Sequence, residues 1–360
     1  MSYPKLTINL PYLKENVETI VALCAKSGID VAGVIKGANG IPEVTQQFSD
    51  GGVAMIASSR LEQLSATKEV GVSQPLMLIR VPMLSELTEM VALCDVSLQS
   101  ELTVLRATNA EAVKQDTIHK VILMADLGDL REGFWDKEEG VRIAEIVENE
   151  LINLELLGVG TNVGCYGSIE ATTDKLQELV DFAENIEAKI GRQLEVISGG
   201  ATTSVMRLFD GNMPARINQL RIGEGILVAY DWSHYYGYDT SFMHHDAFTL
   251  EAEIIEVKNK PTFPVGHRTV DAFGHVQDYT DRGIRRRALA ALGNVDVGSY
   301  EDLEPREARI SLVGASSDHL ILDVEEQPEI AVGDIVSFDL NYASLVFATH
   351  SANVSIEFVS

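Results

Sequence analysis

Residues 31–36 read VAGVIK and residues 120–126 read KVILMAD. Both stretches are short, almost continuously apolar and rich in β-branched residues, which is typical of parallel strands buried on both faces. Six further runs of this kind cover residues 53–59, 75–81, 95–99, 154–161, 195–200 and 219–227. Segments with helical spacing lie between the runs, at residues 83–94, 100–115, 137–151 and 171–191, and Ser100 is the expected N-cap of the second.

Strands that alternate with helices in this way, eight of them over about 200 residues, predict an α/β fold of the (β/α)8 TIM-like barrel type. A doubly wound open sheet is the alternative, but no GxGxxG motif follows the first strand.

The pattern changes from about residue 245 onward. Segments such as FTLEAEIIEVK (248–258) and GDIVSFDLNYASLVFATHSANVSIEFV (333–359) alternate apolar and polar residues and show little helical period. We therefore expect a barrel over residues 1–244 and a C-terminal β domain over residues 245–360. The first strand, at about residues 4–10, is a candidate to join the β domain. The aromatic stretch 230–242 would form the joint, either as a packed hinge or as a wall of the active site.

The charge balance and the cysteines limit the class of partner and the compartment. The 28 Lys and Arg residues against 54 Asp and Glu residues give a formal net charge of −26. Nucleic-acid binding needs a basic surface and is not expected, and an anionic membrane surface is disfavoured. Cys24, Cys94 and Cys165 form no CxxC motif, and neither a signal peptide nor an apolar run of about 18 residues is present. These features predict a cytoplasmic protein that handles small molecules.

Barrel enzymes place their active sites at the carboxyl ends of the strands. Lys36 stands at such an end and is followed by the glycine-rich turn Gly37–Gly40. A lysine that emerges from a buried strand can lose solvation, which lowers its pKa and makes the amine nucleophilic enough to form a Schiff base. The alternative is a strand-end lysine without a catalytic role.

Two glycine-rich segments follow the last two strands, SGGATTS (198–204) and RIGEG (221–225). Glycines and hydroxyl residues at this edge of a barrel suit a phosphate group. Closure of the barrel would put the last strand beside the first, so Arg221 and Lys36 would face a shared cavity. A phosphate seat, a lysine and an arginine around one space suggest pyridoxal 5′-phosphate (PLP) as the cofactor.

Several motifs then match one family. VIKG (34–37), ADLGDLREGF (125–134), SGGATTS, LRIGEGIL (220–227), PVGH (264–267) and DLNYASL (339–345) occur in the order found in the alanine racemase family, which the chain resembles over nearly its whole length. PMLSEL (82–87), VDAFG (270–274), DRGIRRRA (281–288) and GASSDHLILD (314–323) are most similar to the ornithine racemase subgroup. Members of this family are PLP enzymes with a barrel followed by a β domain.

The resemblance implies roles for individual residues. Lys36 would carry PLP and act as a proton-transfer base on one face of the cofactor, and Arg221 would face the ring nitrogen. Arg131 would help to hold the substrate carboxylate. The remaining cofactor-binding positions implied by the resemblance are Thr203 or Ser204, the backbone of Gly223 and Glu224, Tyr342, and Asn162, where the family commonly has a histidine that stacks on the ring.

The sequence also departs from the family pattern. Gly40 replaces a tyrosine four residues after the lysine, and the PxGY motif that carries the second base reads PVGH here. His267 is therefore the candidate for the second base, with His275 and Tyr279 as reserves; the alternative is that His267 is an ordinary surface histidine. In the family this base comes from a partner subunit, so the resemblance implies a homodimer with shared active sites.

These observations predict a PLP-dependent amino-acid racemase, an isomerase, acting on ornithine or a similar basic amino acid. The alternatives are an alanine racemase and a non-catalytic PLP-binding homeostasis protein, although the latter class lacks a β domain. No metal site is expected, because metal-dependent PLP enzymes of this fold need a C-terminal His/Cys pair and no cysteine follows Cys165.

Overall fold

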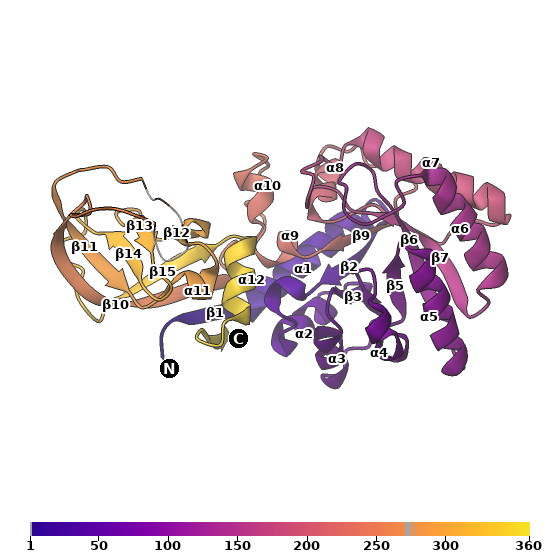
Figure 1. The fold of residues 1–360 in the computed structure, drawn as a ribbon, viewed down its shortest axis with the longest axis horizontal. Coiled ribbons are helices and arrows are strands. Elements are labelled where there is room, and N and C mark those ends of the chain that lie inside the picture. The colour runs from indigo at the N-terminus through magenta and orange to yellow at the C-terminus, as the bar shows by residue number, and fades with distance from the viewer. Residues whose placement is uncertain (1, 271–273, 275, 277) are drawn as a thin grey trace. The chain divides into compact units, whose positions relative to one another are not determined.

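The computed structural model describes residues 2–270, 274, 276 and 278–360. The chain divides into two compact units. One unit is Leu13–Met243, and the other combines the N-terminal residues through Tyr12 with His244–Ser360. The first strand β1 (Lys5–Asn9, indigo in Figure 1) therefore belongs to the same unit as the C-terminal strands.

The first unit is a closed parallel barrel, which confirms the predicted (β/α)8 fold. Its last strand pairs with its first, Ala32 lying opposite Arg221, and this closure excludes the open-sheet alternative. The strands are β2 (Asp30–Val34), β3 (Met55–Ser58), β4 (Leu76–Leu78), β5 (Val96–Gln99), β6 (His119–Ala125), β7 (Leu154–Thr161), β8 (Val196–Ser198) and β9 (Gln219–Ile222). Buried apolar side chains fill the interior, among them Val34, Met77, Leu98, Ile122 and Met124.

Amphipathic helices cover the outside of these strands (Figure 1). They are α1 (Leu10–Ala25), α2 (Pro42–Asp50), α3 (Leu61–Glu69), α4 (Leu87–Leu93), α5 (Leu102–Lys114), α6 (Lys137–Glu150) and α7 (Thr173–Ile190). Helix α7 buries Leu176, Leu179 and Ile186 and ends at Gly191, whose φ of 79° is the left-handed conformation that glycine adopts without strain. The predicted cap of α5 was wrong, because Glu101 rather than Ser100 accepts the N–H of Thr103.

Short helices follow three of the strands at their carboxyl ends. Lys36 lies outside β2, in the 3-10 helix η1 (Lys36–Ala38). The 3-10 helix η3 (Thr202–Val205) and helix α8 (Met206–Phe209) follow β8. The run predicted as a strand over 219–227 stops at Ile222, because the backbone turns at Gly223 and helix α9 (Glu224–Leu227) begins.

The second unit is built on an antiparallel sheet with the strand order β12-β15-β10-β11-β14-β13. Strand β1 pairs antiparallel with β10 and parallel with β16. The bounds are β10 (Phe248–Pro261), β11 (Ile284–Ala290), β12 (Leu303–Pro305), β13 (Ser311–Ala315), β14 (Leu320–Asp323), β15 (Ile335–Leu340) and β16 (Ser355–Val359). Alternate residues of β1 and β10 are buried, including Leu6, Ile8, Leu250 and Ile254.

This unit also contains helices that the alternating pattern did not predict. The segment YASLVFATH forms helix α12 (Tyr342–His350), and α11 (Asn294–Val297) is a single turn. Asn341 caps α12, because its side chain accepts the N–H of Ser344 at 3.0 Å and the Ser344 hydroxyl accepts the N–H of Asn341 at 3.1 Å. Leu345 and Ala348, three residues apart, are buried on one face. The cap and this spacing outweigh the local alternation.

Among the residues the structure describes, no helix is long and apolar enough to cross a lipid bilayer.

Candidate active site

Lys36 lies at the carboxyl end of the barrel, just after β2. Burial lowers the pKa of its ammonium group. Cys165 and Glu132 raise this pKa, whereas the cationic groups of Arg131 and Arg221 lower it further. The structure therefore brings side chains of the loops after β6 and β7 and of strand β9 within electrostatic range of Lys36.

Arg221 lies inside the barrel on β9 and is only 4% exposed. Its guanidinium donates to the Ser198 hydroxyl and to the carbonyl oxygen of Thr161, each at 2.5 Å. Burial lowers the pKa of Arg221 to about 10, so the group remains charged at neutral pH. The pairing of β9 with β2 explains why Arg221 and Lys36 are electrostatic neighbours.

Arg131 projects from the loop that follows β6. The Asp126 carboxylate folds this loop by accepting the N–H groups of Gly128 at 2.9 Å and Leu130 at 3.1 Å. Lys137, at the start of α6, donates to the carbonyl oxygen of Asp126 at 2.6 Å. These contacts fix the backbone on both sides of the segment that presents Arg131.

The Arg131 guanidinium forms a two-pronged ion pair with the neighbouring Glu132. Its terminal nitrogen lies 2.6 Å from Glu132 Oε1, and Nε donates to Oε2. This pairing raises the pKa of Arg131 above its usual value. Sequence reasoning gave Glu132 no role, since only the fold shows that its carboxylate acts electrostatically on Lys36 and Arg221.

Asp129 is a second residue that sequence reasoning missed. Its side chain is 1% exposed, and its carboxylate accepts three backbone N–H groups from the loop after β7, those of Gly164, Tyr166 and Gly167, each at 3.0 Å. Asp129 thereby joins the loop after β6 to the loop after β7. No spacing in the sequence signals this contact, because the donors are 35–38 residues away.

The loop after β7 carries Asn162 and Cys165. The Asn162 amide donates to the Cys165 sulfur at 3.0 Å, and the thiol is exposed. Asn162 was the expected ring-stacking position, whereas Cys165 had been assigned no role. The electrostatic link between Cys165 and Lys36 places this loop at the same site.

The two glycine-rich segments lie against each other. The Thr202 hydroxyl accepts the N–H of Gly225 at 3.1 Å, and the indole of Trp232 donates to the Thr202 carbonyl oxygen at 3.0 Å. Of the two candidate phosphate ligands, Ser204 donates its hydroxyl to Gly199 at 2.7 Å and Thr203 donates to Val163 at 3.3 Å. Trp232, from α10 (Tyr230–His234) in the aromatic stretch, thus supports the glycine-rich segments.

Gly223 is required by close packing. A Cβ at this position would lie 2.9 Å from the carbonyl oxygen of Val34, a distance that real Cβ atoms essentially never show. The turn between β9 and α9 is therefore pressed against β2, two residues before Lys36.

The side chain of Glu224 turns toward the start of α10. One oxygen accepts the N–H groups of Tyr230 at 2.8 Å and Asp231 at 3.1 Å, and the other has no partner among the described residues. Burial raises the pKa of Glu224 to about 8, and the nearby Asp231 carboxylate acts in the same direction. The Glu224 side chain binds the first N–H groups of α10, so only the backbone of Glu224 could contact a cofactor.

The remaining candidates belong to the second unit. Tyr342 is the first residue of α12. His267 is exposed between β10 and β11, and Tyr279 in the same connection lies under the Arg268 guanidinium, 5.0 Å from its ring centroid. His275 falls outside the described residues.

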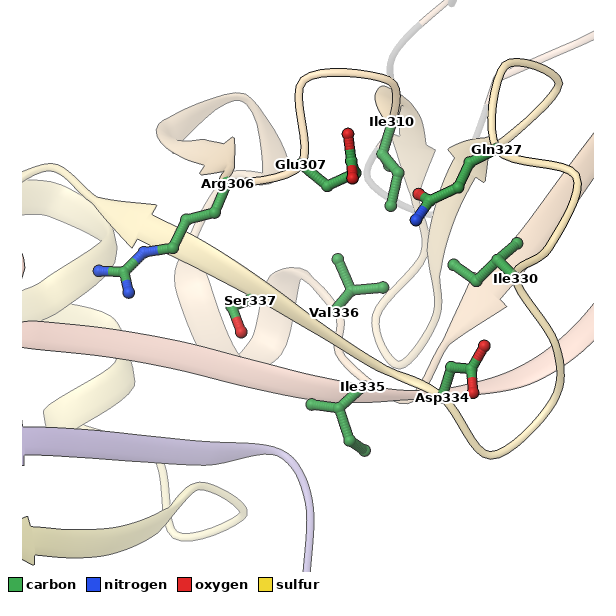
Figure 2. A pocket seen from close by; sticks show the side chains of 9 residues that line it. All are labelled: Arg306, Glu307, Ile310, Gln327, Ile330, Asp334, Ile335, Val336 and Ser337. Atoms are coloured by element: carbon green, nitrogen blue, oxygen red, sulfur yellow. The ribbon is translucent and has the colours of Figure 1, made fainter.

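Of the cavities in the described part of the chain, three are lined by residues other than Lys36, Arg131 and Arg221. Figure 2 shows one of about 450 Å³ in the second unit, where Ile310, Ile330 and Val336 gather beside Gln327. Another, of about 730 Å³, opens at the amino ends of the barrel strands, and a third, of about 270 Å³, includes Tyr279. Among the described residues, no group of three His, Cys, Asp or Glu side chains is arranged to hold a metal ion.

The chain is similar to known proteins over nearly its whole length. Residues 8–231 match the family described as alanine racemase, N-terminal domain. A lysine racemase of Thermotoga maritima is 38% identical over 98% of this chain and 97% of its own length. An ornithine racemase of Acetoanaerobium sticklandii is 37% identical over 96% of each chain. The crystal structure of an alanine racemase from Streptomyces lavendulae superposes with a TM-score of 0.76 at 17% identity, covering 100% of this chain and 98% of that one.

Proposed function

The chain belongs to the alanine racemase family and is an amino-acid racemase, and from that premise we propose that it uses PLP to interconvert the enantiomers of ornithine or lysine. One observation carries the cofactor proposal. A lysine whose pKa is lowered by burial lies beside a buried arginine at the carboxyl end of the barrel. An amine in this environment is more readily deprotonated and can hold an aldehyde.

The groups at the site fit PLP, which presents an aldehyde, a ring nitrogen and a phosphate. Lys36 would hold the aldehyde end, and Arg221, still charged inside the barrel, would donate to the ring nitrogen. The backbone of the two glycine-rich segments would receive the phosphate, since the hydroxyls of Thr203 and Ser204 already donate to backbone carbonyls. Asn162 would border the ring, and Tyr342 of the second unit would reach the phosphate as the family resemblance implies.

When bound, PLP acidifies the α-hydrogen of an amino acid by delocalising the electron pair that proton loss leaves behind. Lys36 Nζ takes or gives the proton on one face of the α-carbon. Arg221 keeps its own proton at neutral pH and so stays a hydrogen-bond donor. Arg131 binds the substrate carboxylate through its planar guanidinium.

Racemisation needs a second proton carrier, because a single base returns the proton to the face it left. His267 is proposed for this role, with Tyr279 and His275 as alternatives. Its support is its position in the PVGH motif and the frequent use of imidazole as a general base in enzymes. In this proposal the histidine comes from a second copy of the chain, so the working form is a homodimer with shared active sites.

The substrate proposal rests on the relatives and on charge. The two curated relatives are named for lysine and ornithine, both diamino acids. A net charge of −26 favours the approach of a substrate that carries an additional ammonium group. Alanine is the alternative substrate. Three cysteines without a disulfide among them are consistent with the proposed cytoplasmic location.

The cofactor site is tested by labelling. The protein is incubated with PLP, reduced with borohydride and digested, and the modified peptide is identified by mass spectrometry. We expect the label on the peptide that contains Lys36 and its loss in Lys36→Arg. A label on another lysine in the folded wild-type protein would contradict the assignment.

The second base is tested by comparing His267→Ala with the wild type. We expect the variant to bind PLP normally and to lose interconversion of the enantiomers. Full racemase activity in His267→Ala would remove His267 from the mechanism and leave Tyr279 and His275 for the same substitution test.

A further inference from the structure

The loop between β6 and α6 carries four carboxylates. Asp136 caps α6, and the other three, Asp126, Asp129 and Glu132, have different partners. Asp126 and Asp129 bind backbone N–H groups, which hold the loop in its shape. Glu132 differs from both, because it accepts hydrogen bonds from the Arg131 side chain. A carboxylate that binds a side chain and not the backbone can exchange that partner for a ligand while the loop keeps its fold.

The Arg131–Glu132 pair is accessible from solvent yet belongs to the Lys36 site. The Arg131 side chain is 41% exposed and that of Glu132 is 18% exposed. Glu132 contributes to the electrostatic environment of both Lys36 and Arg221. An acidic group beside two of the principal cations of the site is therefore available where the substrate is expected.

We propose that Glu132 is the specificity-determining residue that binds the distal ammonium of a basic amino acid. This inference rests on the proposed function. In the structure the Arg131 guanidinium and the Glu132 carboxylate are each other's ion-pair partners. When ornithine or lysine binds, the substrate carboxylate replaces Glu132 at Arg131, and the substrate ammonium replaces Arg131 at Glu132.

This exchange explains selection between substrates. A diamino acid supplies one negative and one positive group, so both members of the opened pair regain a charged partner. A neutral amino acid also binds Arg131 through its carboxylate, but it leaves the Glu132 carboxylate without an ion-pair partner. A site that leaves a charged group unpaired in the wrong complex discriminates against that substrate.

A different role for Glu132 predicts a different result. If Glu132 only oriented Arg131, its loss would weaken the binding of every amino acid carboxylate equally. The proposal requires instead that the loss depend on the distal amine. Comparing substrates that share a carbon skeleton separates the two roles.

The experiment uses two matched pairs, L-ornithine with L-norvaline and L-lysine with L-norleucine, each pair differing only in the distal amine. We would measure kcat/KM for α-proton exchange in the wild type, in Glu132→Gln and in Glu139→Gln. Glu139 is an exposed acid on α6 and serves as the charge-matched control. Normal PLP absorbance in each variant shows that the site is intact.

We expect kcat/KM for ornithine and lysine to fall about 10- to 100-fold in Glu132→Gln, the usual effect of losing one charge-assisted hydrogen bond. The values for norvaline and norleucine should not fall, and Glu139→Gln should match the wild type. Calorimetric titration of the holoenzyme with racemic ornithine and racemic norvaline should show the same change in the affinity ratio without relying on turnover.

Each contrary result has a distinct meaning. If the wild type prefers basic substrates and Glu132→Gln keeps that preference, the inference fails while the proposed function stands. If Glu132→Gln weakens all four substrates equally, Glu132 acts only through Arg131 and the inference also fails. If the wild type itself prefers neutral amino acids, both the substrate proposal and this inference are refuted.

Discussion

Replacing Asp129 by asparagine should loosen the loop that carries Asn162 and Cys165. The Asp129 carboxylate accepts N–H groups from Gly164 and Gly167 on one oxygen and from Tyr166 on the other. An asparagine has one carbonyl oxygen, so its amide would face at least one backbone N–H. A buried donor without an acceptor costs about 1–3 kcal/mol. This corresponds to an increase of about 5- to 150-fold in the fraction of molecules with the loop open.

Hydrogen–deuterium exchange measures this opening directly, because amides in a locally opened segment lose protection. Peptides that cover residues 162–168 should exchange faster in Asp129→Asn, whereas peptides from α7 should be unchanged. Asp136→Asn is the control, since Asp136 belongs to the same loop but caps α6, accepting the Glu138 N–H at 2.9 Å. Unchanged protection of residues 162–168 in folded Asp129→Asn would refute the role assigned to the carboxylate.

Two further predictions concern the segment after β9. Burial raises the pKa of Glu224 to about 8, so the folded state retains a proton that the unfolded state releases near pH 4.5, and this residue's contribution to stability declines between these pH values. In thermal unfolding experiments, Glu224→Gln should therefore lose less stability than the wild type as the pH rises from about 5 to 8. If the stability of both proteins changed equally with pH, the raised pKa would be contradicted. Gly223→Ala should lower the free energy of unfolding by about 1–3 kcal/mol in urea titrations, because its Cβ would lie 2.9 Å from the Val34 carbonyl oxygen. A variant as stable as the wild type would show that the turn relaxes.

The barrel strands could be predicted because parallel strands buried on both faces leave continuous apolar runs. Closure of the barrel then predicted that Arg221 and Lys36 would be neighbours, and the electrostatic coupling between them agrees with this expectation. Helix α12 could not be predicted in this way, because its sequence also fits an alternating strand pattern. Its Asn341 cap depends on reciprocal hydrogen bonds with Ser344 that the alternation did not reveal.

The supporting residues of the site were harder to find than its cations. Lys36 and Arg221 stand at strand ends, where chemistry is expected in a barrel. Asp129 and Glu132 lie within a loop whose shape is set by Asp126 and Lys137, and their partners are known only once that loop is folded. Sequence patterns describe periodic elements well, whereas a carboxylate that binds backbone groups of another loop leaves no periodic signal.

The chain is an amino-acid racemase, and we propose that its proton transfer depends on Lys36. The most direct measurement is the conversion of L-ornithine to its D-enantiomer in deuterium oxide, followed by chiral chromatography and mass spectrometry, with PLP-supplemented wild type and Lys36→Ala in parallel. We predict that the wild type approaches an equal mixture of enantiomers with deuterium at the α-carbon, and that Lys36→Ala produces neither. Wild-type-level racemisation by Lys36→Ala would contradict this prediction.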